Sequence, residues 1–177
     1  MSKSQSVGKQ FELAIKQSIP DHCLLIRLND SPQAFKQSNL TRFTPKSPFD
    51  YLCFDTKSRI LFCLELKSTS NKYMGFEDVN SSEEQNSMIH KHQILGLLKC
   101  SIYPNVVSGF LLNFRLPDNE LTYFMEINQF QKMCESINKK SFNIMDLVLF
   151  GAKKIDGFKK RTRWYWNIED FFETYNN

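Results

Sequence analysis

The sequence has no apolar run near the ~18–20 residues that a membrane-spanning helix requires, so we expect no association with a membrane. It carries only six glycines and six prolines among 177 residues, which excludes collagen-like and low-complexity chains. Its first residues do not have the pattern of a signal peptide, in which a charged segment precedes an apolar one. These absences predict a cytoplasmic globular protein.

Metal-binding side chains are few and widely spaced. The sequence has three histidines and five cysteines, and no two cysteines form a C-x-x-C pair. A structural zinc site usually draws on ligand pairs that are close together in sequence, so we predict no such site. Cys63 lies within an apolar run, which is typical of a buried, reduced thiol. The odd number of cysteines also favours a reducing compartment.

The length suits one domain with a single core, and we expect residues 1–177 to form it. Hydrophobic periodicity predicts helices over 4–18, 87–99, 128–138 and 168–175 and strands over 23–28, 51–54, 60–67, 106–114, 121–127 and 164–166, with 142–150 either helix or strand. This order predicts an α/β fold in which helices flank a central mixed β-sheet. Two polar stretches, 29–47 and 71–86, are expected to form a projecting arm and a mobile loop.

The net charge of +4 permits a polyanionic partner without requiring one. The basic residues gather near the C-terminus, where Trp164, Tyr165 and Trp166 follow Lys153, Lys154, Lys159, Lys160, Arg161 and Arg163. Basic side chains beside aromatic ones can bind a phosphate backbone with partly unstacked bases. A solvated surface strand followed by core aromatics explains the same pattern, so composition leaves both interpretations open.

The segment Pro48-Phe49-Asp50 and the strand ending in Glu65-Leu66-Lys67 carry the clearest candidate site. Glu65 and Lys67 point to one face of their strand because side chains alternate, whereas Leu64 and Leu66 point to the other. A β-hairpin would bring Asp50 beside them, because the start of one strand lies next to the end of its partner. Two carboxylates and a lysine suit a hard divalent cation and a phosphodiester. A simple salt bridge at a strand end is the alternative.

These motifs resemble the PD-(D/E)xK nuclease superfamily and, more narrowly, the RecU-type Holliday junction resolvases of Gram-positive bacteria and their phages. The matching stretches run in the family order: Gly8-Lys9-Gln10-Phe11-Glu12, Ser47-Pro48-Phe49-Asp50-Tyr51, Glu65-Leu66-Lys67-Ser68-Thr69, His92-Gln93, Gly109-Phe110-Leu111-Leu112, Tyr123-Phe124, and Lys140-Ser141-Phe142 leading to Gly151. The resemblance implies a restriction-endonuclease-like core and a cytoplasmic enzyme of a bacterial cell or a phage-infected host.

The resemblance also implies roles for individual residues. Asp50, Glu65 and Gln93 would bind Mg2+, with Mn2+ as a substitute, and Lys67 would stabilise the transition state beside the supporting acid Glu12. The substrate would be branched DNA, a four-way junction cut symmetrically during recombination or repair by a homodimer. The residues expected to bind DNA are Lys36, Arg42 and Lys46 in the arm and Lys153, Lys154, Lys159, Lys160, Arg161 and Arg163 near the C-terminus.

The sequence departs from the family pattern at two places. Pro48 stands where the family usually has threonine, and the gap between Lys67 and Gln93 is longer than usual and acidic. Two other functions therefore stay open. The chain could be a restriction-type or end-processing nuclease of the same superfamily, or a non-catalytic DNA-binding module on a nuclease fold.

Overall fold

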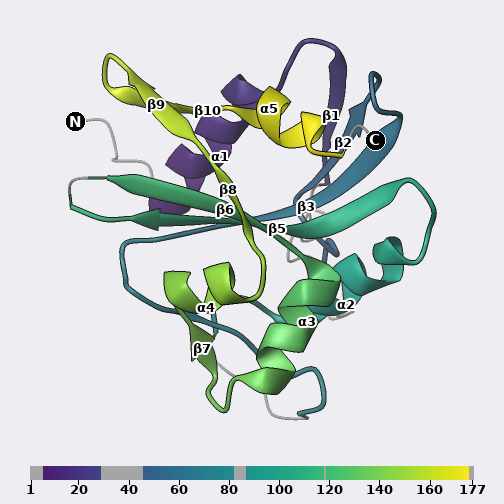
Figure 1. The fold of residues 1–177 in the computed structure, drawn as a ribbon, viewed down its shortest axis with the longest axis vertical. Coiled ribbons are helices and arrows are strands. Elements are labelled where there is room, and N and C mark those ends of the chain that lie inside the picture. The colour runs from purple at the N-terminus through teal and green to yellow at the C-terminus, as the bar shows by residue number, and fades with distance from the viewer. Residues whose placement is uncertain (1–5, 29–45, 82–86, 118, 176–177) are drawn as a thin grey trace, which may run out of the picture.

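In the computed structural model, which describes residues 6–28, 46–81, 87–117 and 119–175, a six-stranded mixed sheet crosses the middle of the molecule (Figure 1). Its strands stand in the order β1 (Cys23–Arg27), β2 (Tyr51–Asp55), β3 (Ile60–Thr69), β5 (Val106–Arg115), β6 (Glu120–Glu126) and β8 (Lys153–Ile155). Only the β3–β5 pair in this sheet is parallel, and the other neighbours are antiparallel. The chain crosses from β3 to β5 through the helix α2 (Lys91–Ser101), which is the connection that a parallel pair needs.

Helices cover both faces of the sheet, as the sequence predicts. One face carries α1 (Val7–Ser18), α5 (Ile168–Glu173) and a hairpin of β9 (Gly157–Lys160) and β10 (Arg163–Trp166). The other carries α2 (Lys91–Ser101), α3 (Ile127–Ser136), α4 (Ile144–Leu149) and a small sheet of β4 (Met74–Gly75) and β7 (Ser141–Phe142). Among the described residues, no helix is long and apolar enough to cross a membrane.

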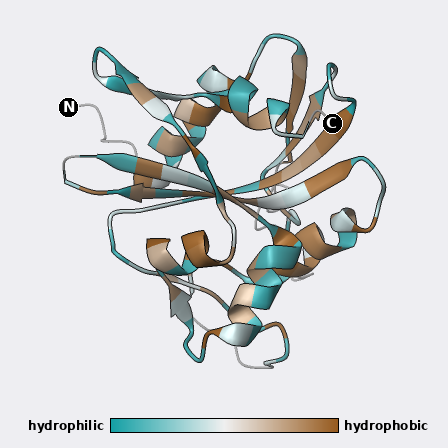
Figure 2. Cartoon of the chain, viewed as in Figure 1, coloured by the Kyte–Doolittle hydropathy of each residue, from teal (hydrophilic) through white to brown (hydrophobic). Residues whose placement is uncertain are grey.

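The hydrophobic core consists of two clusters, one on each face of the sheet. Successive β3 residues contribute to them in turn, with Phe62 and Leu64 facing α1 and α5, and Cys63 facing α2 and α3. Phe62 is fully buried and stacks on Phe172 with ring centroids 4.2 Å apart. Figure 2 shows hydrophobic residues along the central strands and hydrophilic ones at the tip of the β9–β10 hairpin.

Side-chain capping explains where two helices begin. The helix predicted over 87–99 begins at Lys91, where Glu77 Oε2 accepts a hydrogen bond from the Lys91 amide at 2.6 Å. The ambiguous stretch 142–150 contains the end of β7 and then α4, whose first amides donate to the Asn143 side chain.

The predicted arm lies almost entirely outside the described residues, and the predicted mobile loop lies partly outside them. The arm's residues 29–45 and the loop's residues 82–86 are not described, so both assignments stay predictions. The described part of the loop contains the short strand β4, and Met74 and Phe76 there are buried against the core. Short apolar pairs in a polar stretch leave no periodic signal, which is why the sequence prediction missed this strand.

Truncation of Phe62 tests the packing of the core between β3 and α5. We expect Phe62→Ala to lower the free energy of unfolding by about 3–5 kcal/mol, because it removes a fully buried ring and leaves a cavity. Urea denaturation measures this change. Phe158→Ala is the matched control, since its ring is 47% exposed, and we expect a loss below about 1 kcal/mol. Equal losses in the two variants would contradict the described packing.

Candidate active site

The β2–β3 hairpin holds the Asp50 carboxylate against the end of β3. Tyr51 pairs with Leu64 across the hairpin, and the Asp50 amide donates to the Leu64 carbonyl at 3.1 Å. The Leu66 amide in turn donates to Asp50 Oδ2 at 2.8 Å. This bond uses one carboxylate oxygen and fixes the side chain beside β3, in the proximity that the hairpin predicts.

Glu65 is a carboxylate buried in the sheet, with only 2% of its surface exposed. Its Oε1 atom accepts from Lys67 Nζ at 2.8 Å and from Gln93 Nε2 at 2.5 Å. The pKa of Glu65 is raised to about 7, mainly by burial; the Lys67 ammonium lowers it and the nearby Asp50 charge raises it. The site therefore favours additional positive charge next to Glu65.

The capping of α2 orients Gln93 toward Glu65. The Gln93 side-chain oxygen accepts from the His90 amide at 3.0 Å, and its nitrogen donates to Glu65. Because the His90 amide needs an acceptor, this arrangement sets which end of the Gln93 amide faces the carboxylate. A role as metal ligand through the oxygen, which the resemblance implies, would require the side chain to leave this bond.

Pro48 and Gly96 fit together where the Asp50 segment crosses α2. A Cβ atom on Gly96 would lie 2.6 Å from Pro48 Cβ and 2.8 Å from the Pro48 carbonyl oxygen. These separations are shorter than van der Waals contact, so only glycine allows the approach. The same helix carries Gln93, and the contact therefore fixes the distance between the two halves of the site. No pattern in the sequence marks Gly96 as part of it.

Glu12 lies beside the site on the face of the sheet that α1 covers. Its Oε1 atom accepts from the Tyr51 hydroxyl at 2.7 Å and pairs with an Arg27 nitrogen at 2.9 Å. Glu12 does not belong to a cluster of potential metal ligands. Among the described residues, one group of three His, Cys, Asp or Glu residues has its ligand atoms within 4.8 Å of one another, and Glu12 is not part of it. Burial raises the pKa of Asp50, and the charge of Glu12 adds to that rise.

The basic C-terminal residues divide into two groups. Lys153 Nζ lies 3.5 Å from the centre of the Tyr175 ring and donates to Thr174, and Lys154 pairs with Asp156 at 2.7 Å. The other four lie in or at the turn of the exposed β9–β10 hairpin: Lys159, Lys160, Arg161 and Arg163. The aromatic residues divide as well, because Trp166 is buried while Trp164 and Tyr165 are only partly so. The buried Trp166 agrees with the interpretation as a core aromatic, and DNA binding by the exposed hairpin residues stays a prediction.

The predicted arm residues are only partly described, and other cations line the site. Lys36 and Arg42 lie outside the described residues, and Lys46 is exposed. Burial is the main cause that lowers the pKa of His92, and the charge of Lys46 lowers it further. The sequence analysis missed an open groove of about 420 Å³ beside Glu12, lined by Lys9, Lys16 and Arg27. The seven-residue spacing of the two lysines, which places them on one helix face, is the signal that would have found them.

Comparison with known proteins finds a similarity in sequence to a prophage protein and a similarity in structure to a resolvase. No family model matches the chain. It is 36% identical over 124 residues to YotM, an SPβ prophage-derived protein of Bacillus subtilis strain 168, and the match covers 70% of this chain and 57% of YotM, less than two thirds of that relative. A structure of Hjc from Archaeoglobus fulgidus, a Holliday junction resolvase, superposes with a TM-score of 0.44 and 12% identity over 84% of this chain and 93% of Hjc.

The contact between Gly96 and Pro48 predicts that a methyl group on α2 disturbs the Asp50 segment. We expect Gly96→Ala to lower the free energy of unfolding by about 1–3 kcal/mol, because the added carbon forces Pro48 away. Chemical denaturation measures the loss. Gly8→Ala on α1 is the matched control, because no atom lies within 4 Å of its Cβ position and alanine favours a helix. An unchanged Gly96→Ala stability would refute the proposed fit.

Proposed function

We propose that this protein is a magnesium-dependent endonuclease that cuts branched DNA, with Asp50 and Glu65 as metal-binding carboxylates and Lys67 beside them. The observation that carries the proposal is the convergence of these three side chains, two from one strand and one held to it by the Leu66 amide. A salt bridge between Glu65 and Lys67 alone would not require a second carboxylate to be fixed beside the pair.

The donor set fits a hard divalent cation. Asp50 and Glu65 offer carboxylate oxygens, which Mg2+ prefers, and Mn2+ accepts the same ligands. Burial raises the pKa of both side chains, so a cation between them would offset a cost that Lys67 only partly relieves. When bound, the metal would polarise a phosphoryl oxygen and lower the pKa of a bound water.

The remaining side chains would position these groups. Lys67 holds Glu65 through its ammonium group and is placed to stabilise negative charge on a phosphate. Gln93 orients Glu65 from α2 through a hydrogen bond to the same carboxylate oxygen. Glu12 holds Tyr51 and Arg27 at the edge of the groove, so we assign it a supporting role rather than direct contact with the substrate.

A four-way junction is the substrate that we propose, on the strength of the ordered motifs that resemble the RecU-type resolvases. Such a junction has near two-fold symmetry and needs two cuts, so a homodimer is the natural assembly. The prophage origin of YotM agrees with a phage setting for this chain. The groove cations and the β9–β10 hairpin lie on the two sides of α1 and would bind the phosphate backbone.

Cleavage assays on a four-way junction and on a linear duplex of matched sequence test the proposal. We expect Mg2+-dependent cleavage of the junction in preference to the duplex. Asp50→Asn should lower the rate at least about 100-fold, because a neutral amide cannot hold the metal as a carboxylate does. Asp170→Asn, an exposed position on α5, is the matched control and should keep the full rate.

Three results of this assay would contradict the proposal at different levels. Preference for the linear duplex would indicate a restriction-type or end-processing nuclease. Unchanged activity in Asp50→Asn would refute the site. Binding of the junction without cleavage by either protein would indicate a non-catalytic DNA-binding module.

The salt dependence of junction binding tests the groove beside Glu12. We expect the double variant Lys9→Gln/Lys16→Gln to bind more weakly and to reduce the slope of log K against log salt by about 2, because each lost phosphate contact removes about 0.9. Fluorescence anisotropy over a range of salt concentrations measures the slope. The control Lys99→Gln/Lys132→Gln removes the same charge from exposed positions on α2 and α3. Equal slopes in the two double variants would exclude the groove from the interface.

A further inference from the structure

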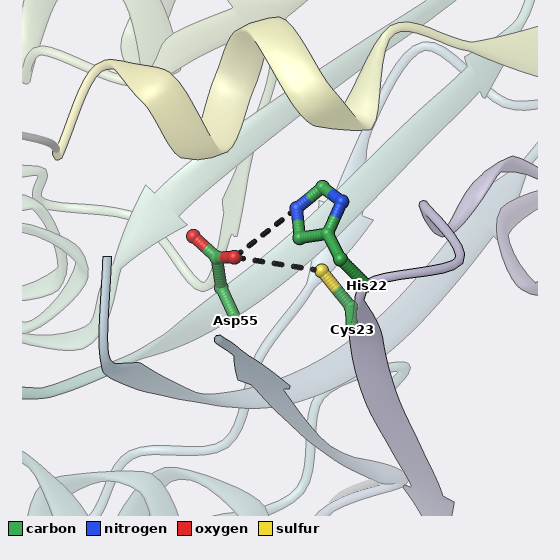
Figure 3. Close-up of side chains that lie close together, drawn as sticks. All are labelled: His22, Cys23 and Asp55. Carbon is green, nitrogen blue, oxygen red and sulfur yellow. Dashed lines mark hydrogen bonds and ion pairs between the residues drawn. The ribbon is translucent and has the colours of Figure 1, made fainter. Parts of the chain in front are cut away.

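A second cluster of potential metal ligands lies at the opposite end of β2 from Asp50. Asp55 is the last residue of β2 and pairs with Cys23, the first residue of β1. His22 lies directly before Cys23 in the sequence. Asp55 Oδ1 lies 3.2 Å from His22 Nε2 and 3.8 Å from Cys23 Sγ (Figure 3). One ligand atom from each residue lies within 4.8 Å of both others. The three side chains therefore point to one small volume.

The arrangement does not suit nucleophilic catalysis by the cysteine. A catalytic thiol needs a base within hydrogen-bonding reach, with the acid behind that base. Here both dashed lines in Figure 3 end on the same Asp55 oxygen, and none joins His22 to Cys23. The Asp55 carboxylate contacts both other groups, and the three ligand atoms all lie within 4.8 Å of one another, as ligands of one ion would.

The two distances to Asp55 Oδ1 are close to the edges of a zinc tetrahedron. With Zn–N and Zn–O bonds of about 2.1 Å and a Zn–S bond of about 2.3 Å, tetrahedral ligand atoms stand about 3.4–3.6 Å apart. The two distances to Asp55 Oδ1 differ from these values by about 0.2 Å each, which small side-chain rotations would absorb. We propose that His22, Cys23 and Asp55 bind one Zn2+ ion, with the fourth position open to water.

Surrounding hydrogen bonds hold the proposed ligands in place, as they do in metal sites generally. The Lys57 amide donates to Asp55 Oδ1 at 3.0 Å, and the Ser58 amide and hydroxyl both donate to Oδ2. The buried Cys53 shares a hydrogen bond with the Cys23 thiol. The His22 side chain is 24% exposed, which leaves a path for the ion to enter from solvent.

Donor type and position separate this site from the candidate active site. A set of nitrogen, sulfur and one oxygen selects zinc over magnesium, whereas Asp50 and Glu65 offer oxygens alone. The five residue steps from Asp50 to Asp55 span about 17 Å of strand, so one ion cannot contact both sites. A zinc ion here would join the edge strand β1 to the β2–β3 turn. Asp55 is far from the other two ligands in sequence, which is why a search for closely spaced ligand pairs predicted no zinc site.

Zinc binding to the full chain, freed of metal and kept reduced in excess Mg2+, tests this proposal. We expect one Zn2+ per chain by elemental analysis, a higher thermal midpoint, and a thiolate-to-cobalt charge-transfer band when Co2+ replaces zinc. His22→Ala and Cys23→Ser should each weaken zinc binding at least about 10-fold. Cys23→Ser should also abolish the band, because the thiolate that produces it is gone.

Cys100→Ser is the matched control, because Cys100 is also a free, partly buried cysteine and, among the described residues, does not belong to a group of His, Cys, Asp or Glu ligands. It should keep both the zinc and the band. Circular dichroism without metal checks that each variant is folded. His22→Ala is the variant less expected to disturb folding, because the His22 side chain is partly exposed. Absence of zinc binding, or equal binding by wild type and folded His22→Ala, would overturn the site. Loss of binding in Cys100→Ser alone would place the zinc elsewhere and would also overturn it.

Discussion

The antiparallel registers of β2 with its two neighbours, β3 and β1, are the constraint on which both sites depend. The β2–β3 register sets Tyr51 against Leu64, and this pairing places Asp50 beside Glu65 at one end of the hairpin. At the other end, the pairing of β1 with β2 sets Cys23 against Asp55. A slip of one residue would turn Glu65 and Lys67 toward α1 and away from Gln93, because side chains alternate between faces. The core residues of β3 would change faces at the same time, so hydrophobic packing enforces the geometry of the site.

The candidate active site places a charge where the fold would otherwise bury an apolar side chain. Removing a carboxylate from water costs several kcal/mol unless partners compensate. Lys67 and Gln93 compensate Glu65 in part, and its pKa of about 7 shows that the compensation is incomplete. Strongly perturbed pKa values are common at functional sites. Gly96 contributes by letting α2, which carries Gln93, approach Pro48.

Local patterns predicted the parts of this structure that depend on neighbours in sequence. Alternation placed Glu65 and Lys67 on one face, and the hairpin brought Asp50 to them, because both rules act over a few residues. Contacts between distant segments left no such pattern. The approach of Gly96 to Pro48 depends on how α2 packs, and composition alone could not separate Trp166, which is buried, from Trp164, which is only partly buried. Sequence thus predicted five of the six strands of the central sheet, its flanking helices and the trio of Asp50, Glu65 and Lys67, but not the edge strand β8. Tertiary packing determined how the trio is supported.

Anomalous X-ray scattering from crystals soaked in Mn2+ tests the central claim most directly, because it locates the ion without depending on activity. We predict a manganese peak within coordination distance of both the Asp50 and the Glu65 carboxylates, with Lys67 remaining close to Glu65. Crystals of Asp50→Asn treated in the same way should lack this peak. A fully occupied peak elsewhere on the chain, with no density between these two carboxylates, would contradict the account.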